Sequence, residues 1–151
     1  MERRTYNDAC GTVARYERDK RRMAELREEI IRRYKGAIAG QPIGHNATDC
    51  RTGDPEARSR DIEKLEMDSV LAKRIEAVGL AFNDLRADRY SWGWYEKDTE
   101  NLILAIQASC DNRKLYAFYG LQQKFKLPFG QDTFIRAKFK VLYRVAELLE
   151  L

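Results

Sequence analysis

Apolar side chains recur every three or four residues along the first part of the chain, which is the spacing of one helical face. The pattern predicts an amphipathic helix over about residues 7–34. The residues that form the stripe are Val13, Tyr16, Met23, Leu26, Ile30 and Tyr34. The stripe is narrow and includes the polar Lys20, so it suits packing against one partner helix.

A second stripe with the same spacing predicts a second long helix, over about residues 54–85. Its members are Leu71, Ile75, Val78, Phe82 and Leu85. Asp54 can cap the first turn, and Pro55 suits the first helical position. The segment between the two helices, about residues 36–55, is rich in Gly and predicts a long loop. We expect the second helix to fold back on the first as an antiparallel hairpin.

The segment "RADRYSWGWYEKD" interrupts the helical pattern and places Trp92, Trp94 and Tyr95 around Gly93. We interpret it as an aromatic joint between two modules. Three further helical patterns follow, over about residues 95–109, 112–124 and 131–149. No alternating strand pattern of useful length occurs, so the sequence predicts an all-α protein.

Two domains are expected from this order of elements. The first, residues 1–89, is the long amino-terminal helical hairpin with its Gly-rich loop. The second, residues 90–151, is a three-helix module of the helix-turn-helix type. The hairpin is also a candidate for homodimerisation, although we favour pairing of its two helices within one chain.

The last helical pattern has one apolar and one basic face. The stripe expected to face the core consists of Ile135, Phe139, Leu142, Ala146 and Leu149. A recognition helix of a helix-turn-helix places its first turns against base edges in the major groove, while Lys and Arg neutralise phosphates. The candidate DNA-binding residues are therefore Gln131, Thr133, Arg136, Lys138, Lys140 and Arg144, together with Lys124 and Lys126 just before the helix.

The distribution of charge supports a polyanion-binding carboxy-terminal end. The chain has 151 residues, of which 34% are charged, and its net charge is +4. Residues 1–111 hold 20 Lys and Arg against 21 Asp and Glu, a net charge of −1. Residues 112–151 hold 8 against 3, a net charge of +5. The positive excess therefore lies in the last segment, where it can attract nucleic acid.

Other functional classes find little support in the sequence. His45, Asp49 and Cys50 share one loop but lack further ligands at metal-binding spacing. No nucleophile elbow or phosphate-binding loop occurs, so we expect neither an enzyme nor a cofactor. Cys10, Cys50 and Cys110 are widely spaced and odd in number, which favours free thiols in a reducing compartment. No apolar run is long enough to span a membrane, and we expect a cytoplasmic protein.

The order of these segments, with "DPEARSRDIEKLE" before the second helix and "TFIRAKFKVLYRVAELL" at the end, resembles a known group of regulators. These are the small phage and prophage late-gene transcriptional regulators of Gram-positive bacteria, the RinA/ArpU-like group, whose carboxy-terminal part is similar to region 4 of sigma factors. The resemblance implies a bacterial host cell, binding to double-stranded promoter DNA, and contact with RNA polymerase.

Two hypotheses about function follow. The first is a phage-type DNA-binding transcriptional regulator that uses the last helix to read promoter or operator DNA. The second is a helical interaction protein, such as a phage-encoded inhibitor of a host protein or nucleoprotein complex, built on a helix-turn-helix scaffold. The apolar turn "KLPFG" and the densely charged, near-neutral hairpin favour this second hypothesis.

Overall fold

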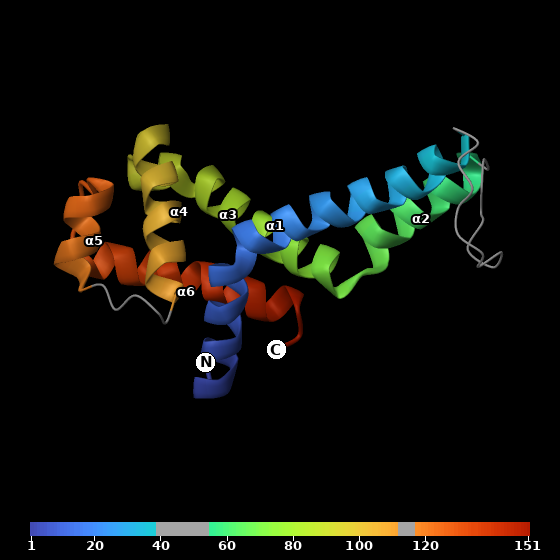
Figure 1. Cartoon of the computed structure of the whole chain (residues 1–151). Helices are drawn as coiled ribbons and strands as arrows, with labels where there is room; N and C mark the ends of the chain where they lie inside the picture. Colours follow the sequence, from blue (N-terminus) through green and yellow to red (C-terminus); the bar gives the residue numbers. More distant parts are fainter. Residues whose placement is uncertain (39–54, 112–116) are drawn as a thin grey trace. The chain divides into compact units, whose positions relative to one another are not determined.

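The computed structural model describes residues 1–38, 55–111 and 117–151, and these residues form helices without any strand. In chain order the helices are α1 (Arg3–Ile38), α2 (Pro55–Asp68), α3 (Val70–Trp92), α4 (Glu96–Cys110), α5 (Phe118–Phe125) and α6 (Gln131–Leu148) (Figure 1). The predicted all-α class is confirmed. The expected loop around residues 36–55 and the start of the helix expected at residue 112 lie largely outside the described residues.

The single helix expected over residues 54–85 is wrong, because Ser69 divides it into α2 and α3. The Ser69 hydroxyl donates a hydrogen bond to the Leu65 carbonyl at 2.6 Å, at the end of α2. The same oxygen accepts a hydrogen bond from the Ala72 amide at 3.0 Å, which caps the first turn of α3. One side chain therefore serves both the end of one helix and the start of the next.

The chain divides into two compact units, and the smaller one is residues 18–73. It contains α2 and the later part of α1, which run side by side (Figure 1). The Tyr34 hydroxyl donates a hydrogen bond to Asp61 at 2.8 Å, and Arg27 pairs with Glu66 at 3.5 Å. Tyr34, late in α1, contacts Asp61, whereas the earlier Arg27 contacts the later Glu66 of α2. The two helices therefore run antiparallel, and the expected antiparallel pairing is confirmed here.

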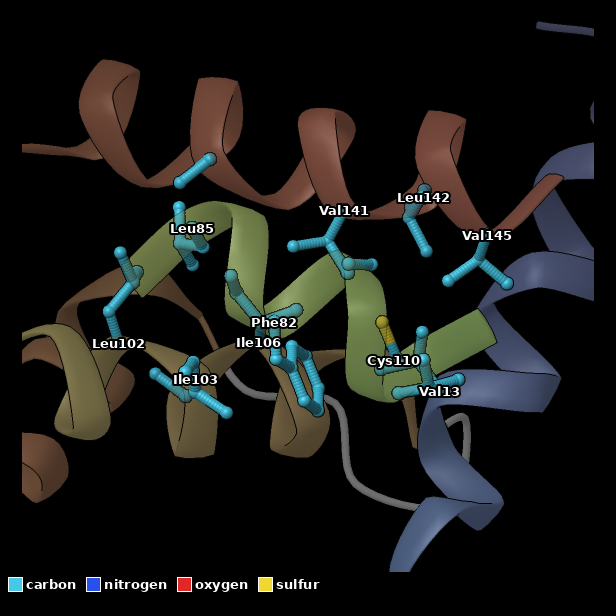
Figure 2. Packing of buried hydrophobic residues seen from close by; sticks show 14 of the residues in the cluster. Val13, Phe82, Leu85, Leu102, Ile103, Ile106, Cys110, Val141, Leu142 and Val145 are labelled. Carbon is cyan, nitrogen blue, oxygen red and sulfur yellow. The ribbon is translucent and has the colours of Figure 1, made fainter. Parts of the chain in front are cut away.

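The larger unit combines residues 1–17 with residues 74–151 and contains the main apolar core. Side chains of α3, α4 and α6 meet in this core together with Val13 of α1 (Figure 2). Those buried most completely include Phe82, Leu85, Leu102, Ile106, Val141 and Leu142. Removing these side chains from water supplies the main favourable free energy of folding for this unit.

The aromatic joint lies inside the larger unit. Gly93 ends α3 with a left-handed φ of 69°, and the Trp94 amide donates a hydrogen bond to the Arg89 carbonyl at 3.0 Å. Trp94 then stacks on Phe129, with ring centroids 4.8 Å apart. The joint thus fixes the turn between α3 and α4 against the segment that precedes α6.

The face of α6 that packs in the core differs in part from the expected one, because Leu142 and Ala146 are buried as expected but two other members of the stripe are not. Its buried residues are Phe134, Ala137, Val141, Leu142, Val145 and Ala146. Ile135 and Phe139, which were expected in the core, are exposed. The helix is apolar over more than half of its circumference, and packing against α3 and α4 selects the side centred on Val141.

The two compact units do not meet at the domain boundary expected between residues 89 and 90. The expected boundary concerns which parts fold independently, and it remains a prediction. No helix in residues 1–38, 55–111 or 117–151 combines the length and apolar character that crossing a bilayer requires.

Candidate nucleic-acid surface

The turn between α5 and α6 has a defined conformation. α5 ends at Phe125, and Lys126 adopts a left-handed φ of 53°, which reverses the chain direction. The Leu127 amide donates a hydrogen bond to the Gln122 carbonyl at 3.1 Å, and the Gln122 side-chain amide donates one to the Phe129 carbonyl at 3.2 Å. Leu127 of the "KLPFG" segment is buried, so its side chain anchors the turn to the core.

The first turn of α6 presents an uncapped helix terminus. Gly130 occupies the N-cap position and offers no side-chain acceptor to the amides of the first turn. Such a terminus carries partial positive charge and favours an anion. Asp132 in the same turn supplies one negative charge that partly offsets it. The Phe134 side chain of the next turn is buried and lies 5.6 Å from the Phe118 ring, which holds α5 against α6.

Four of the eight candidate DNA-binding residues are exposed around this terminus. Gln131 and Arg136 lie on the solvent side of α6, and Lys124 and Lys126 lie at the end of α5. The Lys124 ammonium sits 5.5 Å from the centroid of the Phe125 ring. Thr133 is partly buried beside them. The amino-terminal half of α6 and the preceding turn therefore form one surface with amide and cationic groups, which we call the α6 amino-terminal surface.

The later half of α6 has a different electrostatic environment. Lys140 forms an ion pair with Asp88 of α3. Arg144 pairs with Asp84 of α3 at 3.0 Å and with Glu147 one turn further along α6 at 2.6 Å. These carboxylates neutralise both cations, so this half of α6 presents little net positive charge to a duplex.

Lys138 points toward α1 rather than toward the exposed side of α6. Its ammonium lies 5.6 Å from the centroid of the Tyr6 ring. Burial acts to lower the pKa of Lys138, but the Cys110 and Cys10 sulfurs and the Tyr6 hydroxyl outweigh burial and raise it. The side chain therefore remains charged while half-buried, and it is not available on the α6 amino-terminal surface.

Sequence reasoning missed the residues that divide α6 into these two halves. Asp84 and Asp88 are four residues apart on α3, and Lys140 and Arg144 are four apart on α6. Equal spacing of opposite charges on two amphipathic helices was the available signal, because residues at this spacing share a helical face. No charge count along the chain reveals which helices pack together.

Metal coordination receives no support from the described part of the chain, where no three His, Cys, Asp or Glu side chains gather into a ligand set. The loop residues His45, Asp49 and Cys50 lie outside the described residues. No family model, no curated protein and no solved structure matches this chain. Its function is therefore inferred from its own residues and their geometry.

Proposed function

We propose that this chain binds double-stranded DNA through the α6 amino-terminal surface. The observation that carries the proposal is the gathering of Gln131, Arg136, Lys124 and Lys126 in exposed positions around an uncapped helix terminus. Gln and Arg pair with adenine and guanine edges, and Lys side chains contact phosphates. The first turns of a recognition helix make these contacts in helix-turn-helix proteins.

The two ion pairs to α3 fit this proposal in a specific way. They remove Lys140 and Arg144 from the set of phosphate contacts and leave the positive charge at the start of α6. The contact with DNA would then be limited to the segment between α5 and α6 and about the first two helical turns of α6. The salt dependence of binding would accordingly correspond to few phosphates.

The sequence resemblance to late-gene regulators adds a biological role to this binding. We infer that the duplex is promoter or operator DNA and that RNA polymerase is a second partner. A transcriptional regulator of this kind needs only a duplex-binding surface and a surface for the polymerase. Neither requires a catalytic group.

A fluorescence anisotropy titration of labelled duplexes of random sequence tests the proposal. We expect the affinity of the wild-type protein to fall as salt rises from about 50 to 200 mM, because bound cations are released from the phosphates. The double variant Lys126→Ala/Arg136→Ala should bind roughly tenfold or more weakly, with a salt slope reduced by about two. The matched control is Arg18→Ala/Lys97→Ala, which removes two exposed cations elsewhere and should bind as the wild type does.

Two results would contradict DNA binding through this surface. One is an affinity that does not change with salt. The other is an equal loss of affinity in both double variants, which would mean that net charge alone, rather than the α6 amino-terminal surface, determines binding.

Protein binding is a second candidate function, favoured by two exposed apolar side chains beside Ser69. Met67 is the last residue but one of α2, Val70 begins α3, and both are largely exposed. Exposed apolar groups that lie close together are typical of interaction surfaces. A partner that the wild type retains from nuclease-treated bacterial lysate, and that Met67→Ser/Val70→Ser loses, would support this function. A partner released by the nuclease would instead support DNA binding.

A further inference from the structure

Two cysteines that are 100 positions apart in the sequence meet in the core of the larger unit. Cys10 lies in the early part of α1, and Cys110 is the last residue of α4. Both are free thiols, 4% and 2% exposed, within one apolar cluster. The Cys110 thiol donates a hydrogen bond to the Cys10 sulfur. Figure 2 shows Cys110 beside Val13, which follows Cys10 by one turn of α1.

The surroundings of this pair are not those of ordinary apolar packing. The Lys138 ammonium of α6 acts electrostatically on both sulfurs, and the Tyr6 hydroxyl of α1 hydrogen-bonds Cys10. Buried structural cysteines are usually inert, whereas reactive ones have a nearby cation that favours the thiolate. A cation and a phenol beside a thiol pair therefore point to chemistry at sulfur.

The two sulfurs differ in their protonation. The hydrogen bond from Cys110 lowers the pKa of Cys10 against the opposing effect of burial, and Lys138 and Tyr6 act in the same direction as the hydrogen bond. The hydrogen bond with Cys10 and burial both raise the pKa of Cys110. Of the two sulfurs in hydrogen-bond contact, Cys10 is therefore the one that more readily becomes the nucleophilic thiolate, and Cys110 is the one that keeps its proton.

We propose that Cys10 and Cys110 form a peroxide-sensitive modification site that closes reversibly into an intramolecular disulfide. The Cys10 thiolate attacks one oxygen of hydrogen peroxide, the O–O bond breaks, and Cys10 becomes a sulfenic acid while hydroxide leaves and takes up a proton. The Cys110 sulfur then attacks the Cys10 sulfur and displaces hydroxide, which takes the Cys110 proton as water. Two thiols lose two electrons in total, one peroxide gains them, and two waters form.

This disulfide would connect the start of α1 to the end of α4. It would close a loop of about 100 residues, which restricts the unfolded chain and raises resistance to denaturant. It would also remove the thiolate that faces Lys138 of α6. The inference rests on the thiol pair alone and does not depend on DNA binding.

The test uses the full chain with Cys50→Ser, which leaves Cys10 and Cys110 as its cysteines. After exposure to a small excess of hydrogen peroxide, remaining thiols are alkylated in denaturant and the protein is analysed by mass spectrometry. We expect a loss of two hydrogen masses per chain, a cross-linked peptide pair containing Cys10 and Cys110, and full recovery of both thiols with a dithiol reductant. In Cys110→Ser, Cys10 should stop at a sulfenic acid that dimedone traps.

A matched variant separates reactive chemistry from simple proximity. Lys138→Gln removes the charge of the side chain and shortens it by one atom, while keeping a polar hydrogen-bonding end. Near neutral pH it should slow oxidation severalfold, and at about pH 9.5 or above it should react as fast as the parent, because there both proteins hold the thiolate. Lys97→Gln on α4, which is exposed, should have no effect at either pH.

Three outcomes would overturn the proposal. In the first, both thiols of the folded protein survive a peroxide dose that oxidises them in denaturant. In the second, cross-links form only between separate chains. In the third, Cys10 proceeds to sulfinic acid although Cys110 is present. If Cys110→Ser does not fold, the peptide map of the parent protein still decides among these outcomes.

Discussion

Two carboxylates of α3 determine how much positive charge α6 presents to solvent. Asp84 and Asp88 each bind one cation of α6, Arg144 and Lys140 respectively. All four side chains are partly exposed, so solvent screens both pairs and their contribution to stability is small. Their larger effect is on the surface, because they pair both cations of the later half of α6 and leave Arg136 as an exposed cation in the earlier half.

The pair formed by Arg86 and Glu100 should give a pH-dependent contribution to stability. The Arg86 guanidinium donates two hydrogen bonds to the Glu100 carboxylate, at 2.6 and 3.1 Å, and links α3 to α4. These bonds lower the pKa of Glu100 despite the opposing effect of burial. A carboxyl whose pKa is depressed by folding stabilises the protein above its unfolded-state pKa, and this contribution is lost as the pH falls through its folded-state pKa.

Urea denaturation should therefore show Glu100→Gln to be less stable by about 0.5–1 kcal/mol near neutral pH, a value limited by solvent screening. At a pH well below the ordinary Glu range of about 4.3 the difference should disappear. The control Glu76→Gln changes an exposed carboxyl of α3 and should match the wild type. A difference for Glu100→Gln that persisted at low pH would show that shape rather than charge is responsible.

At the scale of the elements, periodicity predicts that a helix forms, but it does not predict where the helix breaks or which of its faces packs in the core. The patterns predicted α4 and α6 to within about one residue at each end, because strong apolar spacing is interrupted there by Gly93 and Gly130. The break at Ser69 escaped prediction, because serine within a continuous stripe is as compatible with a helix as with a cap. Its two hydrogen bonds become visible only when the backbone is known.

The face of α6 was ambiguous for a different reason. Two overlapping stripes exist, one through Phe139 and Leu142 and one through Phe134 and Val141. Both have helical spacing, so periodicity ranks them equally. In the structure the core-facing side includes Phe134, Val141 and also Leu142, but it excludes Phe139. This side fits the side chains of α3 and α4, a property of three helices together rather than of one.

Two Phe→Ala substitutions on α6 measure this choice directly. Phe134 is 5% exposed and Phe139 is 38% exposed. The two substitutions remove the same atoms from the same helix, so they differ only in how deeply the ring is buried. Phe134→Ala should cost about 3–5 kcal/mol in the free energy of unfolding, because it leaves a cavity between α5 and α6. Phe139→Ala should cost roughly 1 kcal/mol, from the lost contacts with Tyr6 and Tyr143. The reverse order in urea denaturation would mean that Phe139 rather than Phe134 packs in the core.

For the molecule as a whole, sequence located the candidate site only coarsely. The charge excess of the last 40 residues pointed to α5 and α6, and Gln131, Arg136, Lys124 and Lys126 are exposed as expected. Most of the neutralisation of α6 beyond Arg136 comes from Asp84 and Asp88, more than 50 positions earlier, and Glu147 adds a local pair to Arg144. Such long-range pairing is set by how the helices pack, and no local pattern encodes it.

The two compact units differ in how much apolar surface they bury. The main core draws on residues 1–17 and 74–151 alone, and its members come from α1, α3, α4, α5 and α6. Among the described residues of 18–73, burial is confined to Asp19, Tyr34, Ala57 and Ala72. Local opening is least costly where few apolar contacts must be broken.

We therefore expect α2 to exchange its amide hydrogens on the order of 100-fold faster than α4 and α6, after correction for intrinsic rates. Hydrogen–deuterium exchange with peptide-level mass spectrometry measures this. Tyr34→Phe removes the hydrogen bond to Asp61 and should accelerate exchange in α2 while leaving α4 unchanged. Equal protection of α2 and α4 would show that the smaller unit opens only when the whole molecule unfolds, because contacts beyond its own buried residues hold α2 in place.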